Sequence, residues 1–376
     1  MIVMNGFYGA GNFGDDIIML SIINSIREHK PDEKFVIIAI SAHKVPLILN
    51  NIEVISRWDI NKITQVISQC DLLITGGGGI FQDYSGFDVA YHMTKRDTGI
   101  DFYTVPMEIA YLLSKPIMVY GVGIGPISNP IYERYFKISI PWANRITVRD
   151  ITSLEIAKEL VPDLNVEFTV DPAINFLKHY NNYSEYILDN KEYVGICLRH
   201  WHLMSSEEVD RFTSNIAKSI DYINTKYNLD VVLFPFCNTK NDDELLIKVY
   251  NKVLNKNRVL VKPNISMHDA VGILHKLKLL IGMRLHSLLV QSTLNIPCIG
   301  ISYDDKVYEY MKLLELEAYS VNLNEVSYES LKLRIDNVFN NYNKLKNQIT
   351  NKMIYLKQKE KINAKIALSL IGEDYN

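Results

Sequence analysis

The chain has 376 residues, of which 48% are hydrophobic, 22% charged and 10% aromatic, and its formal net charge at pH 7 is -3. This composition is typical of a globular protein and excludes a disordered or collagen-like chain. The small negative charge argues against a general nucleic-acid binder, which is normally strongly basic. The length predicts two domains.

The cysteines and the hydropathy pattern indicate the cellular compartment. The four cysteines show no C-x-x-C spacing, so we predict buried free thiols in a reducing compartment, and no zinc site. They are Cys70, Cys197, Cys237 and Cys298. No stretch reaches the roughly 18 apolar residues of a membrane span, and the N-terminus lacks the basic region of a secretory signal. We therefore expect a cytoplasmic protein, with or without peripheral contact at the inner face of the cell membrane.

Short apolar runs alternate with helical patterns in the first half of the chain. Strands are predicted over Met1–Asn5, Lys34–Ile40, Asp71–Thr75, Pro116–Tyr120, Arg145–Val148 and Val166–Val170. Three of them run into glycine-rich turns, at residues 9–14, 76–79 and 121–126. The first turn leads into a predicted helix over Asp15–His29.

The second half repeats this alternation. Strands are predicted over Tyr193–Leu198, Asp230–Phe236, Arg258–Val261, Leu277–Ile281 and Pro297–Ile301, and helices over Glu207–Lys226, Asp242–Leu254, Met267–His275 and Leu285–Thr293. Such alternation predicts an α/β protein with parallel sheets, arranged as two Rossmann-like domains that face a cleft. We place the N-terminal domain at residues 1–176, a linker at 177–191, the C-terminal domain at 192–345 and a helical tail at 346–376.

The first glycine-rich turn matches G-x-G-x-x-G, a pattern of dinucleotide-binding proteins. Asp15 and Asp16 follow it directly, where they would repel a pyrophosphate, and the second strand ends without an acid for a ribose. We therefore reject an NAD site. Two interpretations of this turn stay open: a tight strand-to-helix turn capped by Asp15, or a substrate-binding loop.

Cationic side chains follow several predicted strands. They are Arg149, Arg199, Arg284 and Lys306, and His286 lies close to Arg284 at the start of a helix. Because ligands of parallel sheets bind beyond the carboxyl ends of the strands, this set predicts an anionic substrate.

The motifs together resemble those of the polysaccharide pyruvyl transferases over residues 1–320. The matching stretches are residues 9–16, 76–83, 121–126, 148–150, 171–173 and 198–201, and the strongest is Gly282–Ser287 with Pro297–Val307. The resemblance implies a fold like that of the GT-B glycosyltransferases and phosphoenolpyruvate as co-substrate, without a further cofactor or a metal. It also implies a pyruvate ketal across two hydroxyls of a sugar, and the nearest relatives suggest N-acetylmannosamine in a lipid-linked cell-wall precursor.

The resemblance and the chemistry of the donor suggest roles for individual residues. His286 and Arg284 are the expected catalytic residues, and Arg149, Arg284, Lys306 and Arg199 the expected donor ligands. The expected acceptor ligands, on the N-terminal domain, are Asn12, Asp15, Asp83, Gly78 and Gly79. The family often has proline after the arginine at position 199, whereas this chain has His200, which makes the orientation of Arg199 an open question. We expect the pair Asp242 and Asp243 in an acceptor-side loop.

Two other functions are compatible with the sequence. A nucleotide-sugar glycosyltransferase would share the architecture and could use Glu309 for the ribose hydroxyls. A non-catalytic sugar-binding or scaffold protein would not need Arg284 and His286, both of which are present. The expected partners are phosphoenolpyruvate and a glycan or lipid-linked saccharide, but no nucleic acid. The sequence does not determine the oligomeric state.

Overall fold

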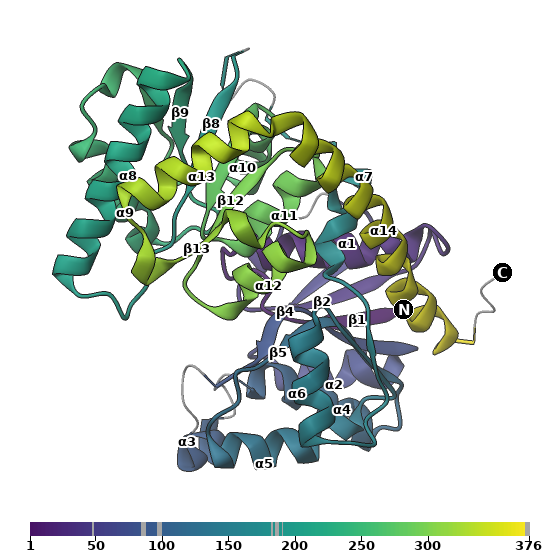
Figure 1. Cartoon of the computed structure of the whole chain (residues 1–376). Coiled ribbons are helices and arrows are strands. Elements are labelled where there is room, and N and C mark those ends of the chain that lie inside the picture. The colour runs from purple at the N-terminus through teal and green to yellow at the C-terminus, as the bar shows by residue number, and fades with distance from the viewer. Residues whose placement is uncertain are drawn as a thin grey trace. The chain divides into compact units, whose positions relative to one another are not determined.

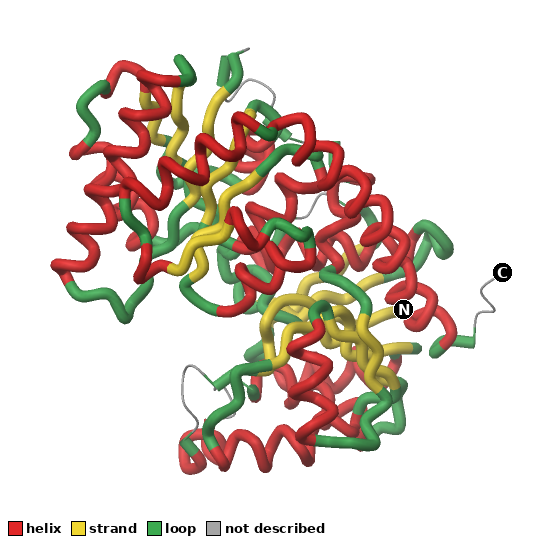
Figure 2. Tube along the Cα trace, in the orientation of Figure 1, coloured by secondary structure: helices red, strands yellow, loops and turns green. Residues whose placement is uncertain are grey.

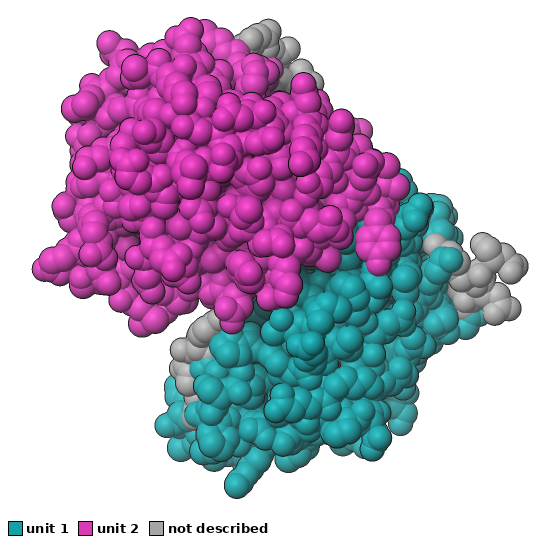
Figure 3. Space-filling view, viewed as in Figure 1, with its two compact units in different colours: residues 1–179, 356–376 teal, residues 180–355 magenta. Residues whose placement is uncertain are grey.

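The computed structural model describes residues 1–46, 49–83, 88–95, 100–181, 183–184, 188–189 and 191–372. The chain divides into two compact units, with residues 1–179 and 356–376 in unit 1 and residues 180–355 in unit 2 (Figure 3). In each unit, strands form a parallel sheet with helices packed on it (Figure 2). The predicted α/β fold with two Rossmann-like domains is confirmed.

Unit 1 contains a seven-stranded parallel sheet in the order β3-β2-β1-β4-β5-β6-β7 (Figure 1). The strands are β1 (Ile2–Asn5), β2 (Phe35–Ala39), β3 (Ile52–Ser56), β4 (Leu72–Phe81), β5 (Ile117–Ile124), β6 (Arg145–Val148) and β7 (Val166–Phe168). The helices are α1 (Phe13–Arg27), α2 (Ile60–Gln69), α3 (Val89–Lys95), α4 (Asp101–Leu112), α5 (Pro130–Ser139), α6 (Ile151–Leu160) and α7 (Phe176–His179). Strand β3 was not predicted from the sequence.

Unit 2 contains a six-stranded parallel sheet in the order β10-β9-β8-β11-β12-β13. The strands are β8 (Tyr193–Cys197), β9 (Asp230–Leu233), β10 (Val259–Val261), β11 (Leu277–Gly282), β12 (Cys298–Ser302) and β13 (Ser320–Asn322). The helices are α8 (Ser206–Lys226), α9 (Lys240–Lys252), α10 (Met267–Leu274), α11 (Leu285–Thr293), α12 (Asp305–Leu313), α13 (Tyr328–Asn340) and α14 (Tyr342–Ser369).

The unit boundaries differ from the predicted domain boundaries at both ends of unit 2. The start of the predicted linker, residues 177–191, is helical in α7 and belongs to unit 1. Residues 182, 185–187 and 190 of that linker lie outside the described residues. The predicted tail over 346–376 is mostly part of α14, which starts at Tyr342 and belongs to unit 1 from Leu356 onward.

The glycine run at 76–79, predicted to be a loop, is part of strand β4. Its residues pair with those of β5, with Gly78 opposite Val122 and Gly79 opposite Gly123. Gly77 has φ of +81°, and a Cβ on it would lie 1.9 Å from a methyl carbon of Ile18 in α1. Glycine is needed here because the helix packs directly on the strand backbone.

Both sheets reverse their strand order beside the first strand of the unit. In unit 1 the chain moves from β1 outward to β3 and returns to β4 on the other side of β1; in unit 2 the reversal lies between β8 and β11. Loops at such a point diverge to opposite faces and leave a ligand-accessible crevice at the carboxyl edge. The candidate residues are therefore those that follow β1, β4, β8 and β11.

A buried carboxyl joins α14 to unit 1. Glu360 is fully buried, and Ser25 of α1, Tyr120 of β5 and Asn175 donate hydrogen bonds to it. Asn363, one turn further on, contacts Thr169 by a 2.8 Å hydrogen bond. Burial raises the pKa of Glu360 to about 7, although the three donors oppose this rise.

We predict that Glu360→Gln flattens the pH dependence of stability. The unfolded chain releases this proton near pH 4.5 and the native protein only near pH 7, so native stability falls as pH rises between these values. The effect is on the order of 3 kcal/mol at most. Burial also raises the pKa of Asp16 to about 7, so Asp16 contributes to the same loss of stability as pH rises toward 7.

Thermal unfolding between pH 4.5 and 8 measures this dependence. Glu360→Gln should reduce the slope, and adding Asp16→Asn should reduce it further. The exposed Glu244→Gln of α9 is the control and should leave the slope unchanged. A wild-type slope in the Glu360→Gln variant would contradict the prediction.

Candidate functional site

Three of the predicted donor-binding cations come together at the carboxyl edge of the unit 2 sheet. Arg199 follows β8, Arg284 follows β11 and Lys306 lies in the first turn of α12, after β12. Arg199 donates a hydrogen bond to the Tyr303 hydroxyl, and its guanidinium carbon lies 4.7 Å from the centre of the Tyr303 ring. The Lys306 Nζ lies 4.9 Å from the same ring centre. Tyr303 therefore holds two of the three cations side by side.

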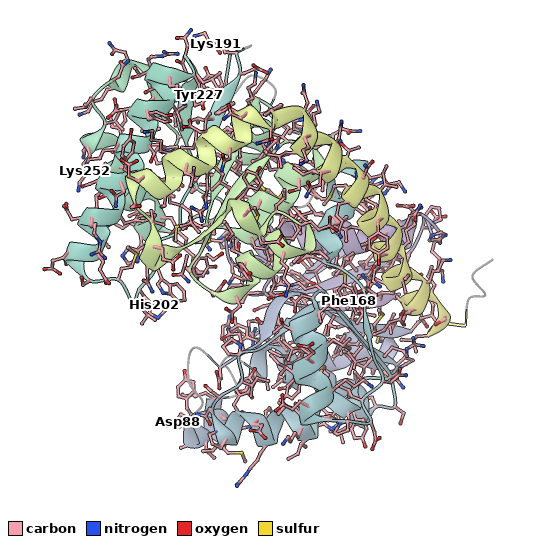
Figure 4. All side chains as sticks on the ribbon, viewed as in Figure 1. Asp88, Phe168, Lys191, His202, Tyr227 and Lys252 are labelled. Atoms are coloured by element: carbon pink, nitrogen blue, oxygen red, sulfur yellow. The ribbon has the colours of Figure 1, made fainter. Side chains whose placement is uncertain are left out.

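The orientation of Arg199, left open by the sequence, is set by its neighbours. The Arg199 backbone N–H donates to the Met283 sulfur at 3.4 Å, which ties the loop after β8 to the loop after β11. The Trp201 ring is tilted against the Tyr303 ring, with centroids 4.8 Å apart, and the Arg199 guanidinium carbon lies 5.3 Å from the Trp201 ring centre. The next residue, His202, marks this loop in Figure 4. Aromatic rings on two sides keep the guanidinium of Arg199 in place.

Arg284 is held by an acid that was expected elsewhere. Asp242, in the first turn of α9 and only 2% exposed, forms an ion pair with Arg284 and accepts a 2.8 Å hydrogen bond from the His200 backbone N–H. Asp242 was expected in a loop, but it lies in the first turn of α9, which brings it against the arginine. Burial is the largest single effect and lowers the pKa of Arg284, but the charge and hydrogen bond of Asp242 together with Cys237 and Tyr303 outweigh it, so the pKa is raised.

His286 is the second residue of α11, and Arg284 is the N-cap residue of the same helix. The Ser287 hydroxyl donates to the Arg284 carbonyl at 2.6 Å and so stabilises the start of the helix. His286 is half-buried. The His286 imidazole therefore lies on the same short segment as Arg284, as expected from the Gly282–Ser287 motif.

The expected acceptor residues Asn12, Asp15, Gly78 and Gly79 lie at the strand reversal of unit 1. Asn12 is the N-cap of α1: its side chain accepts from Gly14 N–H and donates to the Asp15 carboxylate at 2.5 Å. A Cβ on Gly78 would lie 2.7 Å from an Asp15 oxygen. The alternative that Asp15 caps the helix is therefore wrong, because Asn12 does so and Asp15 faces the glycines of β4.

Arg149 lies in unit 1, beside the same glycines. Its guanidinium is 3.5 Å from a Cβ position on Gly79, and it pairs with Asp171 at 3.1 Å and with Asp150 at 3.5 Å. Arg149 is buried, and so is Asp171. The expected donor ligands thus lie on two units: Arg149 on unit 1 and the other three on unit 2.

The Asp83 carboxylate has structural partners. It accepts hydrogen bonds from the backbone N–H groups of Ser128 and Asn129, each at 2.5 Å, and from the Ser128 hydroxyl. Its carboxylate stabilises the loop between β5 and α5, and we do not include Asp83 among the proposed acceptor ligands.

Asp16 is a titratable group of this region that the sequence analysis did not select as a site residue. It is buried and accepts a 3.1 Å hydrogen bond from Gly9 N–H. Burial raises its pKa to about 7, the Gly9 hydrogen bond opposes the rise, and the charge of Asp15 adds to it. The only sequence signal was its position next to Asp15.

The four cysteines are buried and free, as predicted. Cys197, at the end of β8, lies near Arg284, but burial is the larger effect and raises its thiol pKa to about 12. A neutral, buried thiol is a poor nucleophile.

A family model described as polysaccharide pyruvyl transferase matches residues 12–305. This range includes Arg199, Arg284 and His286 of unit 2 and the glycine-lined group of unit 1, and it ends one residue before Lys306. The chain belongs to the polysaccharide pyruvyl transferase family. It is thus a transferase of polysaccharide biosynthesis, and a polysaccharide is its acceptor.

Further comparisons agree with this family and fold. The chain is 20% identical over 316 residues to the amylovoran biosynthesis protein AmsJ of Erwinia amylovora, covering 77% of this chain and 70% of that protein. It superposes on a putative UDP-N-acetylglucosamine 2-epimerase from Listeria monocytogenes with a TM-score of 0.68 at 12% identity, covering 99% and 97% of the chains. For a Neisseria meningitidis UDP-GlcNAc 2-epimerase bound to UDP-GlcNAc, the TM-score is 0.62 at 12% identity, with both chains fully covered. These likenesses show the GT-B-like fold alone.

Within the part of the chain that the structure describes, no helix combines the length and the apolar character needed to cross a bilayer.

We predict strong energetic coupling between Asp242 and Arg284. Either Asp242→Ala or Arg284→Ala leaves a poorly solvated charge without its partner and should lower the free energy of unfolding by about 3 kcal/mol. The double variant should lose less than the sum, with a coupling of about 1–3 kcal/mol measured by urea unfolding. The exposed pair Lys240 and Glu244, on the same helix, is the control and should show almost no coupling. Additive losses for Asp242 and Arg284 would show that they do not interact in solution.

Proposed function

We propose that this family member transfers pyruvate from phosphoenolpyruvate to two hydroxyls of one sugar, forming a ketal and releasing phosphate. The observation that carries the proposal is the convergence of Arg199, Arg284 and Lys306 at one sheet edge, beside the segment that carries His286. A donor with a carboxylate and a phosphate needs several fixed cations within a few ångströms. The family supports the transfer class, and the donor and the sugar are our inference.

Unit 2 would bind the donor. Arg284 offers a planar fork that suits the phosphate or the carboxylate, and Lys306 offers a point charge beside Tyr303. Both arrive with a carboxylate partner, Asp242 for Arg284 and Asp304 for Lys306 at 2.6 Å. These partners hold the cations in place before the donor binds, so less conformational entropy is lost on binding. Arg149 of unit 1 is a further cation of the proposed donor set.

His286 would transfer the protons. A proton delivered to C3 of the enolpyruvyl group turns the methylene into a methyl and leaves oxocarbenium character at C2. One sugar hydroxyl attacks C2 and gives up its proton, the C2–O bond to phosphate breaks, and the second hydroxyl closes the ketal with loss of its own proton. One proton is taken up at C3, two are released, and one of these leaves with the phosphate. Cations near the donor stabilise the departing phosphate, and a histidine can serve as acid and then as base.

Unit 1 would bind the acceptor. The Asp15 carboxylate and the Asn12 amide, beside the backbone of Gly78 and Gly79, offer acceptors and donors that suit neutral sugar hydroxyls. N-acetylmannosamine in a lipid-linked precursor is the specific acceptor that we propose, with peripheral contact of the protein at the membrane that carries such a lipid.

A nucleotide-sugar glycosyltransferase is the alternative, because similar folds have been solved with UDP or UDP-GlcNAc bound. Glu309, the acid suggested for a ribose, is half-buried on α12. Incubation with a crude lipid-linked saccharide and either radiolabelled phosphoenolpyruvate or a labelled sugar nucleotide decides between them. Label transfer and phosphate release from phosphoenolpyruvate are expected; transfer from the sugar nucleotide alone would overturn the proposal.

We predict that His286→Ala lowers turnover by about 10²–10⁴-fold and leaves donor affinity largely intact, because it removes the proton transfer and no cation. Phosphate release measures turnover, and isothermal titration with phosphoenolpyruvate measures affinity. His29→Ala, at an exposed position just after the end of α1, is the control. Near-normal turnover of the His286→Ala variant would show that this histidine is structural.

Lys306→Ala and Arg284→Ala should instead weaken donor affinity. Each loses charge-assisted hydrogen bonds worth about 1.5–3 kcal/mol, or about tenfold to a hundredfold in affinity. Arg284→Lys should not restore it, because a point charge cannot form the bidentate contact. Lys312→Ala, on the exposed side of the same helix as Lys306, is the matched control. Unchanged affinity for phosphoenolpyruvate in both alanine variants would refute the assignment.

A further inference from the structure

Three aromatic side chains of unit 1 gather near the carboxyl edge of its sheet. Phe7 follows β1, Trp58 follows β3, and Phe102 lies in the first turn of α4. The Phe102 ring centroid is 6.2 Å from that of Phe7 and 6.3 Å from that of Trp58. We call these three residues the aromatic ledge. No motif of the sequence analysis included them, because they come from three separate loops.

The backbone under Trp58 is fixed, although its indole is exposed. Trp58 N–H donates to the Ser56 hydroxyl at 3.2 Å, and the following Asp59 caps α2 through Lys62 N–H at 2.9 Å. The side chain of Trp58 is nevertheless 59% exposed, while Phe7 and Phe102 are half-buried. A large apolar ring that is held in place at the surface, on a floor of two further rings, is a preformed surface for a ligand.

A guanidinium lies among the rings. The Arg57 guanidinium carbon is 3.1 Å from the Phe102 ring centre and 5.0 Å from the Trp58 ring centre. The Arg57 backbone N–H is bonded to the Ala39 carbonyl of β2 at 3.0 Å, so the charge is attached to the sheet. The ledge thus combines apolar ring faces with hydrogen-bond donors at its rim.

The ledge is connected to the proposed acceptor residues. Tyr103, next to Phe102, is buried, and the carbonyl of Tyr103 accepts a 3.1 Å hydrogen bond from Asn5 at the end of β1. Burial is the main cause of the raised pKa of the Tyr103 hydroxyl; the charge of Asp15 adds to the rise and that of Arg57 opposes it. The Tyr103 hydroxyl is therefore close enough to interact with the charges of both Arg57 and Asp15.

We propose that the aromatic ledge binds a sugar ring of the polysaccharide acceptor, with Trp58 stacked on the C–H face of the ring and Arg57 bonded to its hydroxyls. This subsite rests on the proposed function, which places the acceptor on unit 1. A pyranose has one face rich in C–H groups and a rim of hydroxyls, so an apolar ring edged by a guanidinium complements it on both counts. Arg57 and Trp58 would then select the saccharide without taking part in the chemistry.

Trp58→Ala and Trp58→Phe test this subsite, with Tyr111→Ala as the matched control. Tyr111 is a similarly exposed aromatic residue, 55% exposed, at the other end of the same helix α4 that carries Phe102. With the crude lipid-linked saccharide as acceptor, Trp58→Ala should raise the acceptor KM about tenfold. The donor KM, kcat and melting temperature should stay near wild type. Trp58→Phe should keep part of the affinity, and Tyr111→Ala should change nothing. An unchanged acceptor KM in Trp58→Ala overturns the subsite.

Saccharide binding without turnover separates this subsite from the proposed function. Saturation-transfer difference NMR with methyl β-N-acetylmannosaminide and methyl β-galactoside should show transfer to ring C–H protons in the wild type, but not in Trp58→Ala. This result would support the ledge even if phosphoenolpyruvate were never turned over, in which case only the proposed donor chemistry would fail. Equal transfer in wild type and Trp58→Ala, or no transfer to either glycoside in the wild type, overturns the subsite.

Discussion

The parallel arrangement of the strands is the constraint on which both candidate regions depend. In a parallel sheet every strand ends at the same edge, so side chains far apart in sequence must meet there. Arg199 and Lys306 are separated by more than a hundred residues, yet both contact Tyr303 because β8, β11 and β12 are neighbours. The strand order reverses beside β1 and beside β8, so the loops after β1 and β4 and those after β8 and β11 diverge and leave room for a ligand.

Close approach between backbone and side chains is the second constraint, and it explains the glycines. A methyl group on Gly78 would collide with the Asp15 carboxylate, and one on Gly123 would lie 2.9 Å from the Arg149 guanidinium. The glycines of β4 and β5 therefore give space to the charged side chains of the loops that pass over them. This is a different role from that of a flexible turn, although the same residue type serves both.

Buried carboxyl groups have different effects in the two units, because one is paired with a cation and the other is bonded by neutral groups. Asp242 lies against a guanidinium and also holds the His200 backbone, so it organises the cations of unit 2. Glu360 is bonded by the neutral donors Ser25, Tyr120 and Asn175, and burial raises its pKa where a cationic partner would have lowered it. A buried carboxyl group thus positions the Arg284 guanidinium in unit 2. In unit 1 the buried carboxyl group of Glu360 is expected to make the packing of α14 depend on pH.

The local pattern of the sequence was enough to predict the α/β class, most of the strands, several helices and the buried cysteines. These follow from hydrophobic periodicity and from residues that lie close together in the chain. Only the tertiary structure decided that the glycines at 76–79 and at 121 and 123 lie in strands, that Asn12 caps α1 and that Asp242 pairs with Arg284. It also decided that Phe7, Trp58 and Phe102 form one surface. Each of these features depends on contacts between segments that are distant in the sequence. The order of the strands brings such segments together, and this order cannot be predicted from local sequence patterns.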